Sequence, residues 1–390
     1  MRIGIDATSW QNTRGYGRYT RGLLSAIVQV DAENDYVFFF DDEVDEGAVP
    51  DGVELRTVST TSPTARTAGA STRRRLRDMW RVGRAMSDPE LDVLLFPTVY
   101  SFVPVRTRAK KIVVIHDTIP EAYPELAFPD WRSRRFWGVK SALARWQSDV
   151  IVTVSEYSRA KIHEHFNIPA DRIFVVGEAA DPVFRRLQRP ILGERLAKLG
   201  IAADRRCLVY VGGFSPHKNV DRLVSVFARA VRGEELDDVR LVLVGEYENE
   251  VFNSDYPRIK RRIEALQLAD RVVFTGYLPD EELVALLNTA TALVLPSLIE
   301  GFGLPAIEAA ACGCPVIATA ESPLPDILAD GGIFIDPTDE AVLGDAMVRV
   351  LCAEETRRRM SRAGLEAARR CSWDRSARQL LDVIDGVCRP

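Results

Sequence analysis

The chain has 390 residues, with 51 Lys and Arg against 56 Asp and Glu and a formal net charge of −5 at pH 7. Hydrophobic residues make up 46% and charged residues 27%, which is ordinary for a globular protein and excludes a collagen, a coiled coil and a disordered chain. The length predicts two or three domains. The acidic balance argues against a nucleic-acid partner, because general nucleic-acid binders carry a basic surface.

The N-terminus has the features of a short strand closed by Asp6 and lacks the apolar core of a signal peptide. No uncharged apolar run approaches the ~20 residues that span a bilayer. We therefore expect a cytoplasmic protein. Six cysteines lie in the second half, and no histidine stands beside the closely spaced pair, so we predict buried thiols and no zinc site. They are Cys207, Cys312, Cys314, Cys352, Cys371 and Cys388.

Strand-like and helix-like segments alternate in the first half, which indicates an open parallel sheet covered on both faces. The predicted strands are residues 2–5, 36–40, 93–96, 111–115, 150–154 and 173–176. The predicted helices are residues 16–30, 73–86, 131–147 and 158–166.

The same pattern restarts after a stretch marked by Pro182 and Pro190, which predicts a second α/β domain. An amphipathic helix is expected to follow from Trp373 to Gly386. We expect domains at residues 1–186 and 187–372, with 373–390 as the C-terminal helix. The second series contains predicted strands at 207–211, 240–244, 272–275 and 292–295, and predicted helices at 219–231 and 258–266.

The densest chemical pattern is the segment 296–311, PSLIEGFGLPAIEAAA. A strand leads into a loop with Gly301 and Gly303, and Pro305 suits the first turn of a helix. Free backbone N–H groups at such a helix start attract phosphate, and glycine allows close approach of a ligand. Glu300 and Glu308 flank this anion site, as hydrogen-bond acceptors for sugar hydroxyls would. The alternative is a capped helix with two surface acids.

Glu300 and Glu308, with Gly-Phe-Gly-Leu-Pro between them, resemble the signature of the retaining glycosyltransferases of family 4, and the resemblance covers nearly the whole chain. It implies the GT-B fold: two Rossmann-like domains facing a cleft, with the C-terminal helix crossing back to the first domain. By this resemblance Glu300 contacts the donor sugar and Glu308 the ribose. The phosphates would lie on the amides of Phe302, Gly303 and Leu304.

A second loop, residues 210–220, again joins a strand to a helix start through small residues. Lys218 can neutralise a leaving diphosphate, which is charge that develops in the transition state. Relatives often carry an arginine where this chain has Gly213, or directly before the lysine, where it has His217. This chain therefore lacks, at these two positions, an arginine that would help to neutralise the phosphates. The alternative is a solvated lysine near a turn.

Three further segments are assigned by the resemblance. His116 follows a predicted strand, at the sheet edge where ligands of open α/β sheets bind, and is expected beside the reacting sugar, while Asp117 anchors the loop. Gly15 and Gly17 belong to a loop near donor and acceptor, in which Arg14 replaces a glycine and could supply the missing cation. The backbone of Tyr277 and Leu278 is expected to read the nucleotide base.

Charge is uneven along the first domain. Residues 31–54 hold ten acids and no base, whereas residues 56–111 carry an excess of eight positive charges. Arg73, Arg74, Arg75 and Arg77 cluster near Trp80, whose ring suits a membrane interface. This predicts peripheral contact with an anionic membrane. A solvated basic helix that serves solubility or an anionic acceptor is the alternative.

The resemblance predicts transfer of a hexose, with mannose from GDP-mannose favoured, from a nucleotide diphosphate sugar to a glycan or lipid-linked saccharide, with retention. No Asp-x-Asp stands at a strand end, so no metal and no other cofactor are expected. His116, Lys218 and Glu300 are the expected catalytic residues. A GT-B-type epimerase or phosphorylase, or a nucleotide-sugar-binding protein without catalysis, remains an alternative.

Overall fold

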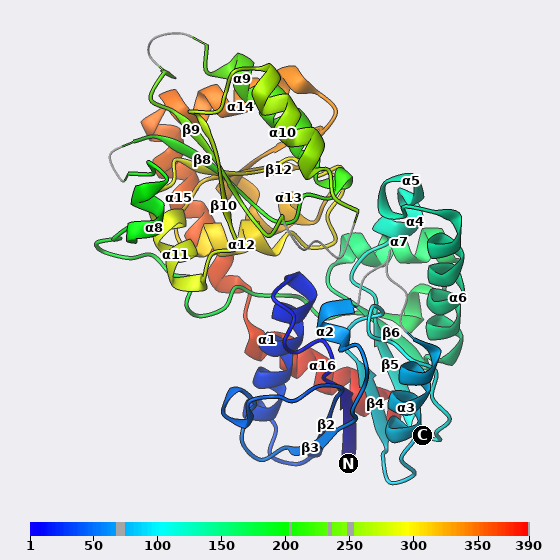
Figure 1. The fold of residues 1–390 in the computed structure, drawn as a ribbon. Coiled ribbons are helices and arrows are strands. Elements are labelled where there is room, and N and C mark those ends of the chain that lie inside the picture. Colours follow the sequence, from blue (N-terminus) through cyan, green and yellow to red (C-terminus); the bar gives the residue numbers. More distant parts are fainter. Residues whose placement is uncertain (68–74, 203–204, 233–235, 248–252, 389–390) are drawn as a thin grey trace. The chain divides into compact units, whose positions relative to one another are not determined.

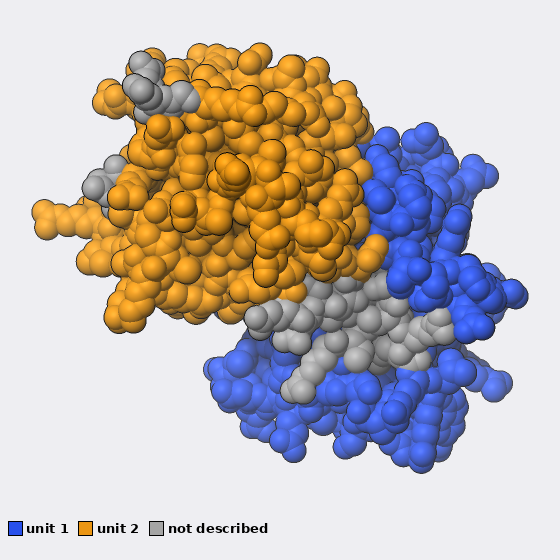
Figure 2. Space-filling model, turned by 45° about the horizontal axis from the view of Figure 1, so that its top comes forward, with its two compact units in different colours: residues 1–178, 372–390 blue, residues 179–371 orange. Residues whose placement is uncertain are grey.

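The computed structural model of the chain describes residues 1–67, 75–202, 205–232, 236–247 and 253–388. It divides into two compact units, one formed by Met1–Glu178 with Ser372–Pro390 and the other by Ala179–Cys371 (Figure 2). Each unit is built on a parallel sheet with helices on its faces (Figure 1). Within the described ranges, no helix combines the length and the apolarity needed to cross a bilayer.

Unit 1 contains a seven-stranded sheet in the order β3-β2-β1-β4-β5-β6-β7. Every neighbouring pair is parallel, and the register sets Ile5 of β1 opposite Phe38 of β2. The strands read as continuous apolar runs because both faces are covered: all four residues of β4 are fully buried. The strands are β1 (Arg2–Asp6), β2 (Asp35–Phe40), β3 (Glu54–Thr57), β4 (Val93–Phe96), β5 (Lys110–Val114), β6 (Val150–Thr153) and β7 (Ile173–Val175).

Right-handed crossovers decide which face of this sheet each helix covers. The chain moves one way from β1 to β2 and the other way from β3 to β4 and from β5 to β6, so α1 covers one face and α3 and α6 cover the opposite face (Figure 1). The helices of unit 1 are α1 (Gly15–Val30), α2 (Thr64–Thr67), α3 (Leu76–Met86), α4 (Ile119–Ala122), α5 (Pro124–Ala127), α6 (Trp131–Gln147), α7 (Glu156–Phe166) and α16 (Trp373–Cys388).

The C-terminal helix α16 packs on α1 and completes unit 1, as predicted. Its apolar face includes Leu380 and Ile384, both fully buried. Trp373 lies against Gly22 of α1 so closely that a Cβ at Gly22 would stand 2.4 Å from the indole. Glycine is therefore required at this position, and the helix pair is fixed by direct contact of backbone and ring.

Unit 2 contains a six-stranded parallel sheet in the order β10-β9-β8-β11-β12-β13. Its strands are β8 (Cys207–Val211), β9 (Arg240–Val244), β10 (Val272–Gly276), β11 (Ala292–Leu295), β12 (Val316–Thr319) and β13 (Gly332–Ile335). Its helices are α8 (Glu194–Lys198), α9 (Val220–Ala230), α10 (Tyr256–Ala265), α11 (Asp280–Thr289), α12 (Leu304–Ala311), α13 (Leu324–Leu328), α14 (Glu340–Cys352) and α15 (Glu354–Arg370).

The alternating pattern located the predicted strands to within two residues. The strands β3, β12 and β13 were not predicted, and neither were several helices, among them the long helices α14 and α15. The predicted helix over 73–86 begins at Leu76, and residues 73 and 74 lie outside the described residues. The C-terminal helix continues to Cys388, two residues beyond its predicted end.

The first unit ends at Glu178, eight residues before the expected boundary at 186, because Glu178 contacts His116 of unit 1. Beyond it, Leu187 N–H donates to Asn288 Oδ1 of unit 2 at 2.7 Å. The second unit ends at Cys371, one residue before the expected 372.

The prediction of six buried thiols is wrong for three of them. Cys207, Cys312 and Cys314 are buried free thiols, as predicted. Cys352 is exposed, whereas Cys371 and Cys388 are half-buried. Cys352 is the last residue of α14, and Cys388 is the last residue of α16. Because these helix ends protrude from the core, the apolar character of cysteine does not decide whether the side chain is buried there.

Candidate functional site

The structure brings Lys218 and Glu300 together at the carboxyl ends of β8 and β11. Lys218 Nζ lies 2.7 Å from Glu300 Oε1, and the two side chains are 22% and 8% exposed. The hydroxyl of Ser297 donates to the same oxygen at 2.5 Å. Glu300 is thus held by one charged and one neutral donor. Ser297 was not singled out in the sequence, and its full burial in a polar loop is the signal that marks it.

Asn219 fixes the loop that carries Lys218. Its Nδ2 donates to the carbonyl of Pro296 at 3.1 Å and to the carbonyl of Pro337 at 2.9 Å, which links the loop after β8 to those after β11 and β13. Lys218 lies just before the helix, whose start was predicted at Asn219. It ends a single 3₁₀ turn, Pro216–Lys218, and Asn219 adopts a left-handed conformation with φ of 60° before α9 begins at Val220.

The start of α12 presents the free amides that the sequence predicted. The backbone N–H groups of Phe302, Gly303 and Leu304 have no hydrogen-bond partner in the part of the chain that the structure describes. Gly303 has φ of +85°, and a Cβ there would stand 2.8 Å from Leu324 Cδ1. Glycine is therefore needed to turn the chain into the helix. Unpaired amides at a helix start carry partial positive charge and suit an anion.

Glu308 lies one turn into α12 and is 3% exposed. Burial raises the pKa of the neighbouring Cys312 thiol to about 12, and the charge of Glu308 contributes in the same direction. Glu300 is 6% exposed, so both acids of the signature are buried and neither is a surface charge. A buried carboxylate needs polar partners, which excludes the reading of this segment as a helix cap with two surface acids.

His217 does not supply a second cation beside Lys218. Its Nδ1 is buried and has no hydrogen-bond partner among the described residues. Burial, and then the neighbouring Lys218 charge, lower the pKa of His217 to about 3, so the imidazole is neutral at pH 7. Its backbone carbonyl accepts from Leu298 N–H at 2.8 Å. Nearby, the carbonyl of Gly213 accepts from the Tyr210 hydroxyl at 2.5 Å.

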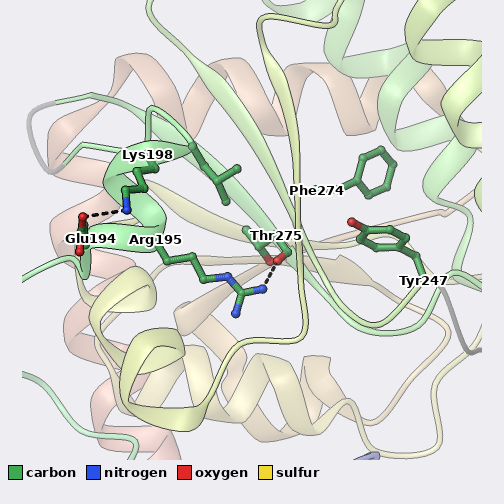
Figure 3. Close-up of a pocket in the computed structure, with 7 residues that line it drawn as sticks. Glu194, Arg195, Lys198, Tyr247, Phe274 and Thr275 are labelled. Atoms are coloured by element: carbon green, nitrogen blue, oxygen red, sulfur yellow. Dashed lines mark hydrogen bonds and ion pairs between the residues drawn. The ribbon is translucent and has the colours of Figure 1, made fainter.

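A cavity of about 530 Å³ lies beside the carboxyl end of β10 (Figure 3). Arg195 points into this region from α8 and donates to the carbonyl of Thr275 at 2.6 Å. Tyr247 stacks on Tyr256, with ring centroids 4.6 Å apart. The sequence did not single out Arg195 or Tyr247, because no motif links them. The lining residues are Glu194, Arg195, Lys198, Leu199, Tyr247, Phe274 and Thr275.

Tyr277 and Leu278 follow directly after β10, at the same sheet edge as the cavity. Tyr277 keeps 43% of its surface exposed, whereas Leu278 is 2% exposed and belongs to the core. The Leu278 side chain is therefore part of the core, and the base-reading role expected of the backbone here stays a prediction.

In unit 1, His116 follows β5 and is held on both sides. Its Nδ1 lies 3.3 Å from Glu178 Oε1, and its Nε2 lies 3.1 Å from the carbonyl of Pro97. Asp117 accepts from Ile119 N–H at 2.9 Å and so anchors the loop, as predicted. Glu178 was not singled out in the sequence because 62 residues separate it from His116.

The loop before α1 shows why one of its glycines is required. A Cβ at Gly17 would stand 2.0 Å from the carbonyl oxygen of Asn12, so the helix can approach this loop only with glycine. A Cβ at Gly15 would meet nothing within 4 Å. Arg14 precedes the helix in an extended conformation, and its N–H donates to Asn12 Oδ1 at 2.8 Å. Packing therefore explains Gly17 and leaves Gly15 without a structural constraint.

Two family models match consecutive parts of the chain. "Glycosyltransferase Family 4" matches residues 13–183, and "Glycosyl transferases group 1" matches residues 194–367. The chain belongs to the family 4, group 1 glycosyltransferases. The second match includes Glu300 and Glu308, and the matched regions coincide closely with the two units of the structure.

Relatives of this glycosyltransferase include the O-antigen chain mannosyltransferase B of Escherichia coli, 31% identical over 241 residues. The match covers 60% of this chain and 60% of that relative, so the chain spans less than two thirds of its length. Among solved structures, sucrose-phosphate synthase from Thermosynechococcus elongatus matches with a TM-score of 0.75 at 19% identity, covering 99% and 98% of the two chains.

A second solved structure is Anabaena HepE in complex with UDP-glucose, with a TM-score of 0.73, 17% identity and 99% of each chain covered. At these identities both structures show the fold alone. The fold is GT-B, with two Rossmann-like units, as the resemblance implied.

Acid should destabilise this glycosyltransferase partly through His217. In the unfolded chain His217 takes up a proton near its ordinary pKa of 6.5, but in the folded chain only near 3. Its contribution to stability is therefore present above pH 6.5 and is lost as the pH falls from about 6.5 towards 3. We expect His217→Gln to lose less stability than the wild type between pH 7.5 and pH 4.5, measured as the thermal unfolding midpoint.

The matched control is His165→Gln, because His165 is exposed on α7. It should follow the wild type across the same pH range. Equal acid sensitivity of His217→Gln and the wild type would contradict the assignment of a buried neutral imidazole.

Proposed function

We propose that the protein transfers a hexose from a nucleotide diphosphate sugar to a glycan or lipid-linked saccharide, with retention at the anomeric carbon. The observation that carries this proposal is the Lys218–Glu300 pair beside the unpartnered amides of α12. A cation and three free N–H groups form a site for a diphosphate, and a buried carboxylate next to them can accept hydrogen bonds from sugar hydroxyls.

Each part of the donor has a proposed partner in unit 2. The diphosphate lies on Lys218 and on the amides of Phe302, Gly303 and Leu304. Glu308 accepts from the ribose, and Glu300 from the hexose. Gly213 and Gly301 leave room for the backbone to approach the donor. The nucleotide base lies at the edge formed by Tyr277 and Leu278, where the neighbouring cavity with Arg195 and Tyr247 offers a flat, partly polar space.

Catalysis in this proposal is positioning plus electrostatics. Lys218 is paired with Glu300, so binding of the diphosphate offers its ammonium group a second anionic partner. The hydroxyl of the acceptor forms a bond to the anomeric carbon while the bond from that carbon to the diphosphate oxygen breaks, and the hydroxyl proton passes to the leaving phosphate. Negative charge on the leaving diphosphate grows in the transition state, and Lys218 stabilises it. Attack from the face of the leaving group retains the anomeric configuration without a covalent intermediate. Transfer without a metal stays a prediction.

Mannose is the favoured hexose and GDP the favoured nucleotide. The O-antigen chain mannosyltransferase B of Escherichia coli supports mannose, while the complex of Anabaena HepE with UDP-glucose keeps UDP as the competing nucleotide. A thermal-shift panel of GDP, UDP and ADP tests the base, since a ligand at 100 times its Kd adds ~2.7 kcal/mol. Transfer from the corresponding sugar nucleotide to a saccharide acceptor tests the reaction.

The competing functions differ in what they require of unit 1. An epimerase or phosphorylase needs groups that exchange protons or phosphate at the sugar ring, whereas both nitrogens of His116 already have partners. A binding protein without catalysis would use the same diphosphate site, so it differs from a transferase in forming no product. Product formation that depends on an acceptor separates transfer from both alternatives.

We predict that Glu308→Ala weakens binding of the free nucleoside diphosphate more than Glu300→Ala does. Loss of a hydrogen bond to a charged group costs about 1.5–3 kcal/mol, and only Glu308 is assigned to the nucleotide. Glu300→Ala, by contrast, releases Lys218 from its carboxylate partner and leaves the ammonium for the phosphates. Titration calorimetry with GDP and UDP measures both affinities. Equal losses in the two variants would show that the assignment is wrong.

Lys218→Ala should lower turnover about 10²–10³-fold, as loss of one donor to developing charge does in comparable sites. Its thermal midpoint should fall by a smaller factor than turnover, because Glu300 loses its cation but keeps the Ser297 hydroxyl, and Asn219 still fixes the loop. Lys260→Ala, on the exposed face of α10, is the control and should match the wild type. Near-normal turnover of Lys218→Ala would assign the phosphate to another cation, with Arg14 the first candidate.

We also propose that unit 1 contacts an anionic membrane. Leu76 and Trp80 of α3 are 76% and 63% exposed, next to the exposed Arg75 and Arg77. Helix α6, on the same face of the sheet, has no acidic residue, and its Trp131 and Trp146 are 66% and 78% exposed. Exposed tryptophans among basic residues suit a lipid interface, where each base contributes ~1 kcal/mol.

Co-sedimentation with vesicles should show binding when the vesicles contain anionic lipid, and the binding should weaken with salt. Alanine at Arg73, Arg74, Arg75 and Arg77 should reduce it, although the first two lie outside the described residues. Alanine at Arg358, Arg359 and Arg362, exposed on α15 of unit 2, should not. Binding that is absent, or that survives the first set of substitutions, contradicts the proposal.

A further inference from the structure

The two segments at which the chain leaves and re-enters unit 1 meet around His116. The first segment ends at Glu178, and the second begins at Ser372. The Tyr19 ring of α1 packs edge-on against the His116 ring, with centroids 4.6 Å apart, and also against Trp373 at 5.9 Å. Glu178 contacts His116 directly. His116 therefore contacts Glu178, the end of the first segment, directly. It is linked to Trp373, at the start of the second segment, through the Tyr19 ring.

Both nitrogens of His116 face groups that accept hydrogen bonds. The Pro97 carbonyl at Nε2 can only accept, and an ionised carboxylate at Nδ1 can only accept. Neither ring nitrogen is therefore free to face a substrate. The side chains of His116 and Glu178 are 11% and 7% exposed, so water cannot easily replace either partner.

We propose that Glu178 is a positioning residue that holds the His116 imidazole through Nδ1, so that the ring takes part in the proposed transfer with both nitrogens occupied and does not act as a base. The inference rests on the proposed function and on the part expected of His116 in it. A base would have to take a proton from its substrate at a free ring nitrogen, and both nitrogens of His116 face groups of unit 1. Glu178 therefore limits His116 to a role other than proton transfer.

Two other titratable groups lie near His116 and Glu178, the Tyr19 phenol and the Asp117 carboxylate, and neither holds a ring nitrogen of His116. Burial raises the pKa of Tyr19 well above its ordinary value, and the Glu178 charge adds to this, so the phenol stays neutral. Its hydroxyl has no hydrogen-bond partner among the described residues. The carboxylate of Asp117, adjacent in the chain, accepts from the backbone of its own loop at Ile119. Glu178 is the carboxylate in contact with the ring.

The test compares Glu178→Gln, His116→Asn and the double variant in the full chain. Release of GDP from GDP-mannose is measured across pH, or of UDP from UDP-glucose if the wild type uses that donor. Glu164→Gln, exposed on α7, is the matched control. We expect Glu178→Gln to lower kcat about ten- to hundredfold with less change in KM, to alter the pH profile, and to add little to His116→Asn.

A second readout does not depend on activity. The chain has four histidines, so ring ¹⁵N spectra can resolve each one. Glu178→Gln should shift the His116 ring signals and leave those of His163 and His165 in place. Full additivity of the two substitutions, or a lower thermal midpoint with an unchanged pH profile, would overturn the inference. If the wild type turns over neither donor, the proposed function fails, and unchanged ring signals in Glu178→Gln would still overturn the inference separately.

Discussion

Parallel strands with both faces covered place all their outgoing loops at one edge, and this constraint assembles the candidate site. In unit 2 the loops after β8, β10 and β11 carry Lys218, Tyr277 and Glu300 although these residues are far apart in the chain. The strands themselves contribute apolar residues to the core and nothing to the chemistry. Chemistry is therefore confined to a few residues after each strand, where the backbone is free to turn.

Much of this arrangement could be predicted from the sequence, because continuous apolar runs followed by small-residue loops identify buried parallel strands. The free amides at Phe302, Gly303 and Leu304 follow from a glycine and a proline in the right order. The strands β12 and β13 were not predicted. Gly332–Ile335 is only half-buried, and a short strand with mixed burial lacks the pattern that distinguishes strand from loop. Val316–Thr319 is fully buried and follows directly on a turn that contains Cys312 and Cys314, so burial does not explain why this strand was missed.

Contacts between individual side chains of distant segments could not be predicted from the residues, although the resemblance implied that the C-terminal helix returns to the first unit. The Lys218–Glu300 pair joins residues 82 positions apart, and the two carbonyls that Asn219 contacts lie 77 and 118 residues away from it. A motif identifies which residue types are present but not which partner each one has in the folded chain. This is why Ser297, Arg195 and Glu178 emerged only from the structure, and why His217, a plausible cation in the sequence, is a buried neutral ring.

The discontinuity of unit 1 has a consequence for how the chain is made. Unit 2 has all its residues once synthesis reaches Cys371, whereas unit 1 still lacks α16, which begins at Trp373. Until then the face of α1 that packs on α16 stays uncovered, and so does the site of the Trp373 ring against Gly22. The unit translated first is thus completed last, and its apolar surface is exposed during translation for as long as the whole of unit 2 takes to emerge.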